Sequence, residues 1–130
     1  MINDQYASTC VLIVDDSEYI RTIMTTLFKK AGITKIHIAA DGGVAIDKYK
    51  EVKPDIIILD VMLPKKSGME VLKEIRFTDT ETKVIMISSL ATQEFIKEAK
   101  EAGANYYFVK PYDNQVFMKV VRELLNQQKH

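Results

Sequence analysis

Polar side chains directly follow several short aliphatic runs of this sequence, at positions where a buried strand would end. They come from four separate segments: Asp15 and Asp16, then Asp60, then Ser88 and Ser89, and finally Lys110. If the aliphatic runs form one parallel sheet, their carboxyl ends meet at a single edge, which is where such sheets bind ligands. Carboxylates, hydroxyls and an ammonium group would then converge on one site.

That combination of groups indicates phosphoryl chemistry assisted by a metal ion. The carboxylates of Asp15, Asp16 and Asp60 would repel one another unless a cation shares their site. Oxygen ligands without histidine or cysteine favour Mg²⁺ over zinc. A carboxylate beside Mg²⁺ and the Lys110 ammonium can attack a phosphoryl group and form an aspartyl phosphate, because both cations offset the repulsion between the two anions.

Length and composition predict a single soluble, cytoplasmic domain. The chain has 130 residues, 47% of them hydrophobic, which is enough for one buried core. Lys and Arg together number 18, as do Asp and Glu, so no net charge attracts the chain to nucleic acid or to an anionic membrane. The one cysteine, Cys10, cannot form an internal disulfide, and its place beside an apolar run is typical of a small buried hydrophobe. We find no segment long and apolar enough to span a bilayer and no signal sequence.

Strands and helices that alternate along the chain would position the site. Short aliphatic or aromatic runs predict strands at residues 9–14, 35–40, 55–59, 84–87 and 105–109. Apolar residues at helical spacing predict helices over residues 20–31, 45–52, 69–75, 95–102 and 117–125. Ile36 and Ile38 alternate with polar residues, which is typical of an edge strand with one wet side.

This order predicts an α/β fold in which helices cover both faces of a parallel sheet. Asp113 or Asn114 would cap the last helix. We expect only the segments 1–8 and 126–130 to be loose.

Five segments carry a family resemblance: VLIVDDS at 11–17, PDIIILDVMLP at 54–64, SGMEVL at 67–72, VIMISS at 84–89 and EAGANYYFVKPYD at 101–113. In this order they resemble the receiver domains of two-component response regulators. The resemblance predicts a receiver domain over residues 9–126, an N-terminal extension at 1–8 and a C-terminal tail at 127–130. It implies a doubly wound, flavodoxin-like (βα)5 fold of the CheY-like type, with a five-stranded parallel sheet. The strand order 2-1-3-4-5 comes from the family and not from the residues alone.

The resemblance also assigns the residues at the metal site. Asp60 matches the phosphoacceptor of the family. Asp16 matches a direct Mg²⁺ ligand, Asp15 matches the acid that holds the ion mainly through water, and the backbone carbonyl of Met62 matches the third protein ligand.

Three further residues would bind the phosphoryl group or respond to it. Ser88 takes the place of the hydroxyl residue that bonds the phosphoryl group, and Lys110 matches the lysine that pairs with it. The Lys110–Pro111 peptide bond matches one that is cis in the family. Tyr107 falls on an aromatic switch position, whose ring turns inward as the hydroxyl residue closes on the phosphate, although simple core packing is the alternative.

The implied function is a phosphorylation-dependent signalling switch and not an enzyme with outside substrates. A sensor histidine kinase or a phosphotransfer protein would supply the phosphoryl group, and the chain would catalyse only its own phosphorylation and dephosphorylation. A downstream effector protein would read the fourth helix, fifth strand and fifth helix, at candidate positions Thr92, Phe95, Lys97, Tyr107, Lys119 and Arg122. We expect no direct contact with nucleic acid or membrane, and either a monomer or a dimer induced by phosphorylation.

The pathway stays open at this point. A chain of 130 residues leaves none for an output domain. It is therefore expected to be a single-domain regulator, of motility or a phosphorelay, or a receiver cut from a longer protein.

Other functions fit the same chemistry less well. A Mg²⁺-dependent phosphatase with an aspartyl nucleophile commonly has a second acid two residues later, where this chain has Met62. A degenerate receiver that only binds partners would lack an acid or the lysine. A nucleotide- or flavin-binding protein would need a phosphate-binding loop, and neither G-x-G-x-x-G after the first strand nor a P-loop is present.

Two local features of the sequence bear on partners and timing. Lys65 and Lys66 add positive charge beside the site, either in a plain solvated loop or as a docking point for an acidic partner or phosphodonor. Met62 and Leu90 lie two residues beyond the phosphoacceptor and the hydroxyl residue. If their side chains overhang the phosphoryl group and hinder water, the phosphorylated state should be long-lived.

Overall fold

Five parallel strands alternate with five α-helices between residues 4 and 127, the part of the chain that the computed structural model describes. The elements are η1 (Asp4–Tyr6), β1 (Cys10–Val14), α1 (Glu18–Lys30), β2 (Lys35–Ala39), α2 (Gly42–Val52), β3 (Ile56–Asp60), α3 (Gly68–Arg76), β4 (Lys83–Ser88), α4 (Gln93–Glu101), β5 (Tyr106–Val109) and α5 (Asn114–Asn126). The strands form one sheet in the order β2-β1-β3-β4-β5, and every neighbouring pair is parallel. The predicted fold class and strand order are confirmed.

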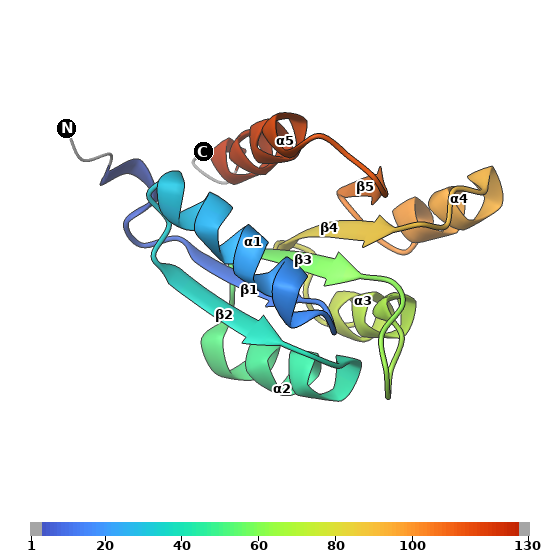
Figure 1. Ribbon diagram of the computed structural model, residues 1–130. Helices are drawn as coiled ribbons and strands as arrows, with labels where there is room; N and C mark the ends of the chain where they lie inside the picture. Colours follow the sequence, from blue (N-terminus) through green and yellow to red (C-terminus); the bar gives the residue numbers. More distant parts are fainter. Residues whose placement is uncertain (1–3, 128–130) are drawn as a thin grey trace.

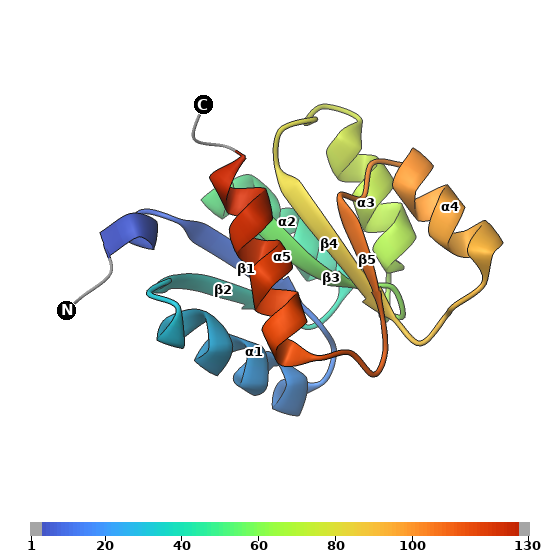
Figure 2. The same cartoon turned by 90° about the horizontal axis from the view of Figure 1, so that it is seen from above.

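Helices cover both faces of the sheet, with α1 and α5 on one face and α2, α3 and α4 on the other (Figures 1 and 2). The strands divide their side chains between these layers. In β1, Val11 and Ile13 pack on the α1–α5 side, whereas Leu12 and Val14 pack on the opposite side. Such alternation follows from the two-residue period of a strand and explains why the central strands are continuously apolar.

The strand β3 is the most deeply enclosed support of the site. All of its residues are buried, and Ile56, Ile57 and Leu59 are 0% exposed. It pairs with β1 on one edge and with β4 on the other. A side chain at the end of this strand is therefore held by a rigid element.

The strand β2 lies at an edge of the sheet, as predicted. Ile36 packs against the α1–α5 core, but Ile38 on the same face is 47% exposed. The expected burial of that face is incomplete because Ile38 borders a groove whose α1 side is mostly polar, including Thr22 and Thr25.

Local sequence sets the helix ends. Asp113 is the N-cap of α5, where its side chain accepts hydrogen bonds from the backbone N–H groups of Gln115 and Val116. Gly32 follows α1 with φ 91° and Gly103 follows α4 with φ 111°, backbone angles that glycine adopts without steric cost. Asp113, one of the two predicted caps, is confirmed.

The N-terminal segment is more ordered than the sequence indicated. Tyr6 is 2% exposed and packs into the α1–α5 core, and the Gln5 side chain donates a hydrogen bond of 3.0 Å to Asn126. The expectation of loose ends was wrong for these residues, because a single aromatic anchor leaves no periodic pattern. Residues 1–3 and 128–130 of those segments lie outside the described part, and the domain boundaries at 9 and 126 stay a prediction.

The burial of Cys10 and the character of the helices bear on two expectations from composition. Cys10 is half-buried, its Sγ lies 3.9 Å from the carbonyl oxygen of Val52, and burial raises the pKa of its thiol. From residue 4 to residue 127, none of the helices combines the length and the apolar character needed to cross a membrane.

Candidate functional site

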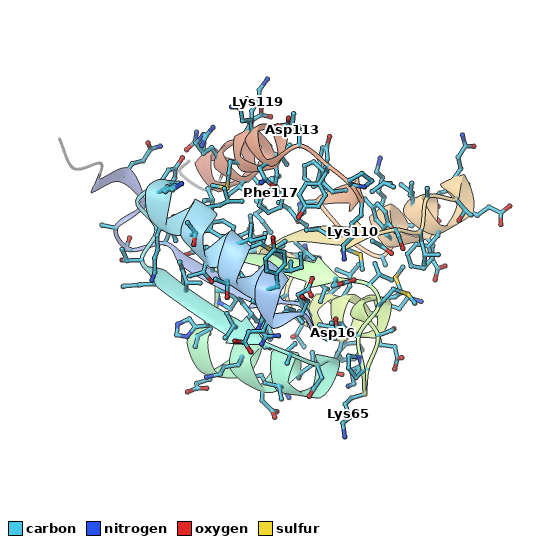
Figure 3. The ribbon with its side chains drawn as sticks, viewed as in Figure 1. Asp16, Lys65, Lys110, Asp113, Phe117 and Lys119 are labelled. Atoms are coloured by element: carbon cyan, nitrogen blue, oxygen red, sulfur yellow. The ribbon has the colours of Figure 1, made fainter. Side chains whose placement is uncertain are left out.

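The polar residues predicted at the strand ends do meet at one edge of the sheet. Asp60 and Ser88 are the last residues of β3 and β4, while Asp15 directly follows β1 and Lys110 directly follows β5. Figure 3 shows Asp16 and Lys110 at this end of the sheet. The convergence arises because parallel strands all end on the same side.

Three carboxylates form the centre of the site. One oxygen from each of Asp15, Asp16 and Asp60 lies within 4.8 Å of the others. Asp15 and Asp60 are 3% and 5% exposed, whereas Asp16 faces solvent. The cluster is therefore buried on one side and open on the other.

The electrostatics of the cluster favour a bound cation. Burial raises the pKa of Asp15 to about 6, a backbone hydrogen bond of 2.8 Å from Ser17 opposes that change, and the charge of Asp60 adds to it. A divalent ion would remove the cost of holding these charges together. The donor set contains carboxylate oxygens and neither histidine nor cysteine, so it fits Mg²⁺.

Both carboxylate oxygens of Asp60 have a partner. The backbone N–H of Met62 donates a hydrogen bond of 3.0 Å to Oδ1. The ammonium group of Lys110 lies 3.2 Å from Oδ2, in an ion pair whose aspartate side chain is 6% exposed. The Lys110–Pro111 peptide bond is cis, as the resemblance implied.

A second polar network joins β4 and β5 through the loop after β4. The Oγ of Ser88, which is fully buried, accepts a hydrogen bond of 3.1 Å from the backbone N–H of Leu90. The hydroxyl of Tyr107 donates a hydrogen bond of 2.9 Å to the carbonyl oxygen of the same residue. Tyr107 is 8% exposed and meets Phe95 of α4 edge-on, with ring centroids 6.0 Å apart. The neighbouring Ser89 is exposed.

Comparison with known proteins agrees with this geometry. A family model described as the response regulator receiver domain matches residues 11–122. The chain belongs to this family. Receiver domains signal through phosphorylation and bind Mg²⁺ at an acidic pocket, and the aspartate cluster of this receiver fits such a pocket.

Named relatives of this receiver include signalling proteins from several bacteria. Chemotaxis protein CheY of Thermotoga maritima is 39% identical over 102 residues, covering 78% of this chain and 85% of that protein. Sporulation initiation phosphotransferase F of Bacillus subtilis is 34% identical over 115 residues, covering 88% and 92%. A chain in the CheX–CheY–BeF₃–Mg²⁺ complex from Borrelia burgdorferi superposes with a TM-score of 0.85 at 36% identity, covering 89% of this receiver and 88% of that chain.

The receiver site includes an arginine that the sequence reasoning missed. The guanidinium of Arg21 donates a hydrogen bond of 2.7 Å to the backbone carbonyl of Asp15. Its Nε is buried and has no hydrogen-bond partner among the residues that the structure describes. Arg21 thus holds the turn that carries Asp15 and Asp16. The signal available in the sequence was an arginine one helical turn beyond the Ser17 cap.

Tyr112 combines packing in the core with an electrostatic influence from the acids. Its ring packs against Phe108 and Phe117 with centroids 5.3 and 5.5 Å away. Burial raises the pKa of its hydroxyl to about 12, and the charges of Asp15 and Asp60 add to that rise. The electrostatic influence of the two acids places the tyrosine close to the site.

The loop after β3 folds tightly against the strand that carries the phosphoacceptor candidate. The N–H of Gly68 donates a hydrogen bond of 2.9 Å to the carbonyl of Val61, and a Cβ atom at Gly68 would lie 2.3 Å from the carbonyl oxygen of Asp60. Lys66 pairs with Glu74, whereas Lys65 points away at the loop tip (Figure 3). The loop can come this close to the backbone of Asp60 only because the residue at position 68 has no side chain.

The candidate readout positions occupy three elements. Thr92 caps α4, and Lys97 on that helix and Lys119 on α5 are exposed. Figure 3 shows Lys119 pointing outward from α5. Arg122 is also exposed, and it lines a groove between α5 and α1.

Proposed function

We propose that Asp60 accepts a phosphoryl group while Asp15, Asp16, Asp60 and the backbone carbonyl of Met62 hold Mg²⁺. The observation that carries this proposal is the environment of one buried carboxylate. Asp60 Oδ2 lies 3.2 Å from the Lys110 ammonium, inside a cluster of acids suited to a divalent cation. With Mg²⁺ bound, this nucleophile would have positive charge on both sides.

The transfer begins when an oxygen of Asp60 attacks the phosphorus atom of a phosphohistidine on the donor protein. The new oxygen–phosphorus bond gives an aspartyl phosphate. The bond from phosphorus to the imidazole nitrogen breaks, and its electron pair stays on that nitrogen, which then takes up a proton from water. Mg²⁺, when bound, would offset the charge on the phosphoryl oxygens.

Lys110 and Ser88 would stabilise the phosphorylated state. The Lys110 ammonium that now pairs with Asp60 would turn to a phosphoryl oxygen and keep its proton. The Ser88 hydroxyl would donate a hydrogen bond to another phosphoryl oxygen. In hydrolysis, water attacks the phosphorus atom, the aspartyl oxygen–phosphorus bond breaks, and inorganic phosphate leaves the regenerated carboxylate.

Tyr107 would carry this change to a protein-binding surface on α4, β5 and α5. The Ser88 Oγ accepts a hydrogen bond from the N–H of Leu90, and the Tyr107 hydroxyl donates one to the carbonyl of Leu90. Movement of Ser88 would therefore shift the backbone of Leu90 and alter its hydrogen bond with Tyr107. Phosphorylation would shift the balance between two arrangements of this loop and of Tyr107.

The phosphoryl donor that we propose is a sensor histidine kinase or a phosphotransfer protein. A downstream effector protein would then bind the phosphorylated chain. We place this exchange in the cytoplasm, without direct binding to nucleic acid, and with the chain a monomer or a dimer induced by phosphorylation. Turnover of other substrates is not part of the proposal, because Met62, with a side chain 62% exposed, stands where a second acid would be needed.

The test is intact-mass measurement after incubation with acetyl phosphate, with and without Mg²⁺. We expect one added phosphoryl group on the wild type and on Asp47→Asn, an exposed acid of α2 that serves as the control. Asp60→Asn should gain none, and chelation of Mg²⁺ should abolish the addition to wild type. Addition to Asp60→Asn at the wild-type rate would reject the assignment.

A further inference from the structure

The helices α1 and α5 cover the same face of the sheet (Figures 1 and 2). A groove lies between these two helices. It has a volume of about 490 Å³, within the range of roughly 300–1,000 Å³ found for ligand clefts. Its lining consists of Leu27, Lys30 and Ala31 from α1 and of Asn114, Gln115, Met118 and Arg122 from α5. None of the residues with a proposed role in phosphoryl transfer takes part.

The charge of the groove is of one sign. Lys30 and Arg122 are both exposed, and no carboxylate belongs to the lining. Neither cation forms a salt bridge within residues 4–127. The nearby carboxylate of Asp113 accepts hydrogen bonds from the N–H groups of Gln115 and Val116, so it caps the helix. In a chain with no net charge, this groove holds a local positive excess.

The floor of the groove is apolar. Met118 is 6% exposed, and Leu27 and Ala31 are half-buried against the same core. A methionine adapts its shape to different apolar partners because its side chain is unbranched and flexible. Between the helices, an apolar strip therefore runs beside two cations that form no salt bridge in the described part of the chain.

We propose that this groove binds an acidic amphipathic helix of a partner protein. Apolar side chains on one face of such a helix would lie on Met118 and Leu27, while its carboxylates would pair with Lys30 and Arg122. The amides of Asn114 and Gln115 offer hydrogen bonds at the rim. The charge pattern decides the occupant, because a basic or uncharged helix would leave both cations unpaired and a second copy of this groove would place like charges together.

This docking surface extends from α5 over α1, whereas the candidate readout surface extends from α5 over β5 and α4, and Arg122 belongs to both sets. Binding in the groove does not depend on phosphorylation.

Binding can be tested with a synthetic 15-residue helix that carries leucines on one face and glutamates on the other, and with its counterpart in which lysine replaces every glutamate. Labelling the methionine methyl groups with ¹³C gives an NMR signal from Met118, which a Met118→Leu variant identifies. We expect the acidic peptide to move that signal in a saturable way and the basic peptide to leave it unchanged. Phosphodonor is omitted, so failure here would leave the chemistry of Asp60 untouched.

Charge reversal provides the second arm. Lys30→Glu combined with Arg122→Glu should weaken binding of the acidic peptide roughly tenfold, since each exposed pair contributes modestly. Lys100→Glu, the same change at an exposed lysine of α4, should have no effect. The proposal fails if the double variant binds as tightly as wild type, if both peptides bind alike, or if sedimentation without peptide reveals a dimer that the double reversal dissociates.

Discussion

The Lys110 ammonium lies 3.2 Å from Oδ2 of Asp60, and the backbone N–H of Met62 lies 3.0 Å from Oδ1 of the same carboxylate. The lysine therefore has two effects on the site. It offsets the charge of Asp60, the proposed nucleophile, and its positive charge would oppose binding of Mg²⁺ by the three acids.

Replacing Lys110 by methionine should separate these two effects. We expect phosphorylation by acetyl phosphate in saturating Mg²⁺ to slow by about 10²-fold, as when one charge-stabilising donor is lost. Affinity for Mg²⁺, measured by calorimetry, should rise because a competing cation is gone. Lys97→Met, at an exposed site on α4, should leave both quantities unchanged. Weaker Mg²⁺ binding in Lys110→Met would contradict this account.

Stability should depend on pH in a way that reports on Asp15. Its pKa in the folded state is about 6, raised from 3.8, so the folded state binds more protons than the unfolded state between these values. Without Mg²⁺, the contribution of Asp15 to the free energy of unfolding should therefore fall as pH rises from about 4 to above 6. Urea unfolding of wild type and Asp15→Asn, in the presence of a chelator at pH 4.5 and pH 7, measures this contribution. It is the difference in the free energy of unfolding between the two proteins. Asp15→Asn should gain stability relative to wild type at the higher pH, and Mg²⁺ should narrow the gap.

Tyr107→Phe removes only the hydroxyl that donates to the Leu90 carbonyl. We expect a loss of about 1 kcal/mol in the free energy of unfolding, the usual scale for one hydrogen bond. Phosphorylation of Asp60 should proceed normally, whereas the NMR shifts that it causes in α4 should shrink. Tyr106→Phe, at a neighbouring residue that is 40% exposed, is the control. Undiminished shifts in α4 would remove Tyr107 from the switch.

Met62 and Leu90 should govern how long the phosphoryl group persists. Their side chains are 62% and 38% exposed, so either can be replaced without disturbing the core. Met62→Asn together with Leu90→Asn should speed hydrolysis several-fold by admitting water, as followed by intact mass after removal of acetyl phosphate. Phe77→Asn, at a residue 88% exposed beyond α3, should not change the rate. If the aspartyl phosphate has the same lifetime in wild type, the double variant and Phe77→Asn, then Met62 and Leu90 do not shield the phosphoryl group from water.

Gly68→Ala should strain the loop that supports Asp60. The added Cβ would lie 2.3 Å from the Asp60 carbonyl oxygen and 2.7 Å from the Cα of Val61. We expect a loss of roughly 1–3 kcal/mol in the free energy of unfolding, the usual cost of overpacking. At Gly43, the nearest atom to an added Cβ is 3.3 Å away, so Gly43→Ala is the matched control and should be tolerated. Urea titration of both variants checks the difference.

Sequence reasoning recovered the site residues because each directly follows an apolar run, and a strand buried on both faces must present its last side chain at the sheet edge. The strand order needed the family resemblance. Arg21 escaped notice because its partner is a backbone carbonyl, which no side-chain pattern reports. The burial of Tyr6 and the exposure of Ile38 depend on how distant elements pack, and so does the α1–α5 groove.

Leu90 divides its work between backbone and side chain. Its N–H and carbonyl are the groups that Ser88 and Tyr107 contact, while its side chain is partly exposed to solvent. Under the proposed roles, a substitution here would change how long the phosphoryl group persists and would leave both backbone hydrogen bonds in place. The lifetime of the signal and its transmission would then be able to evolve independently at a single position.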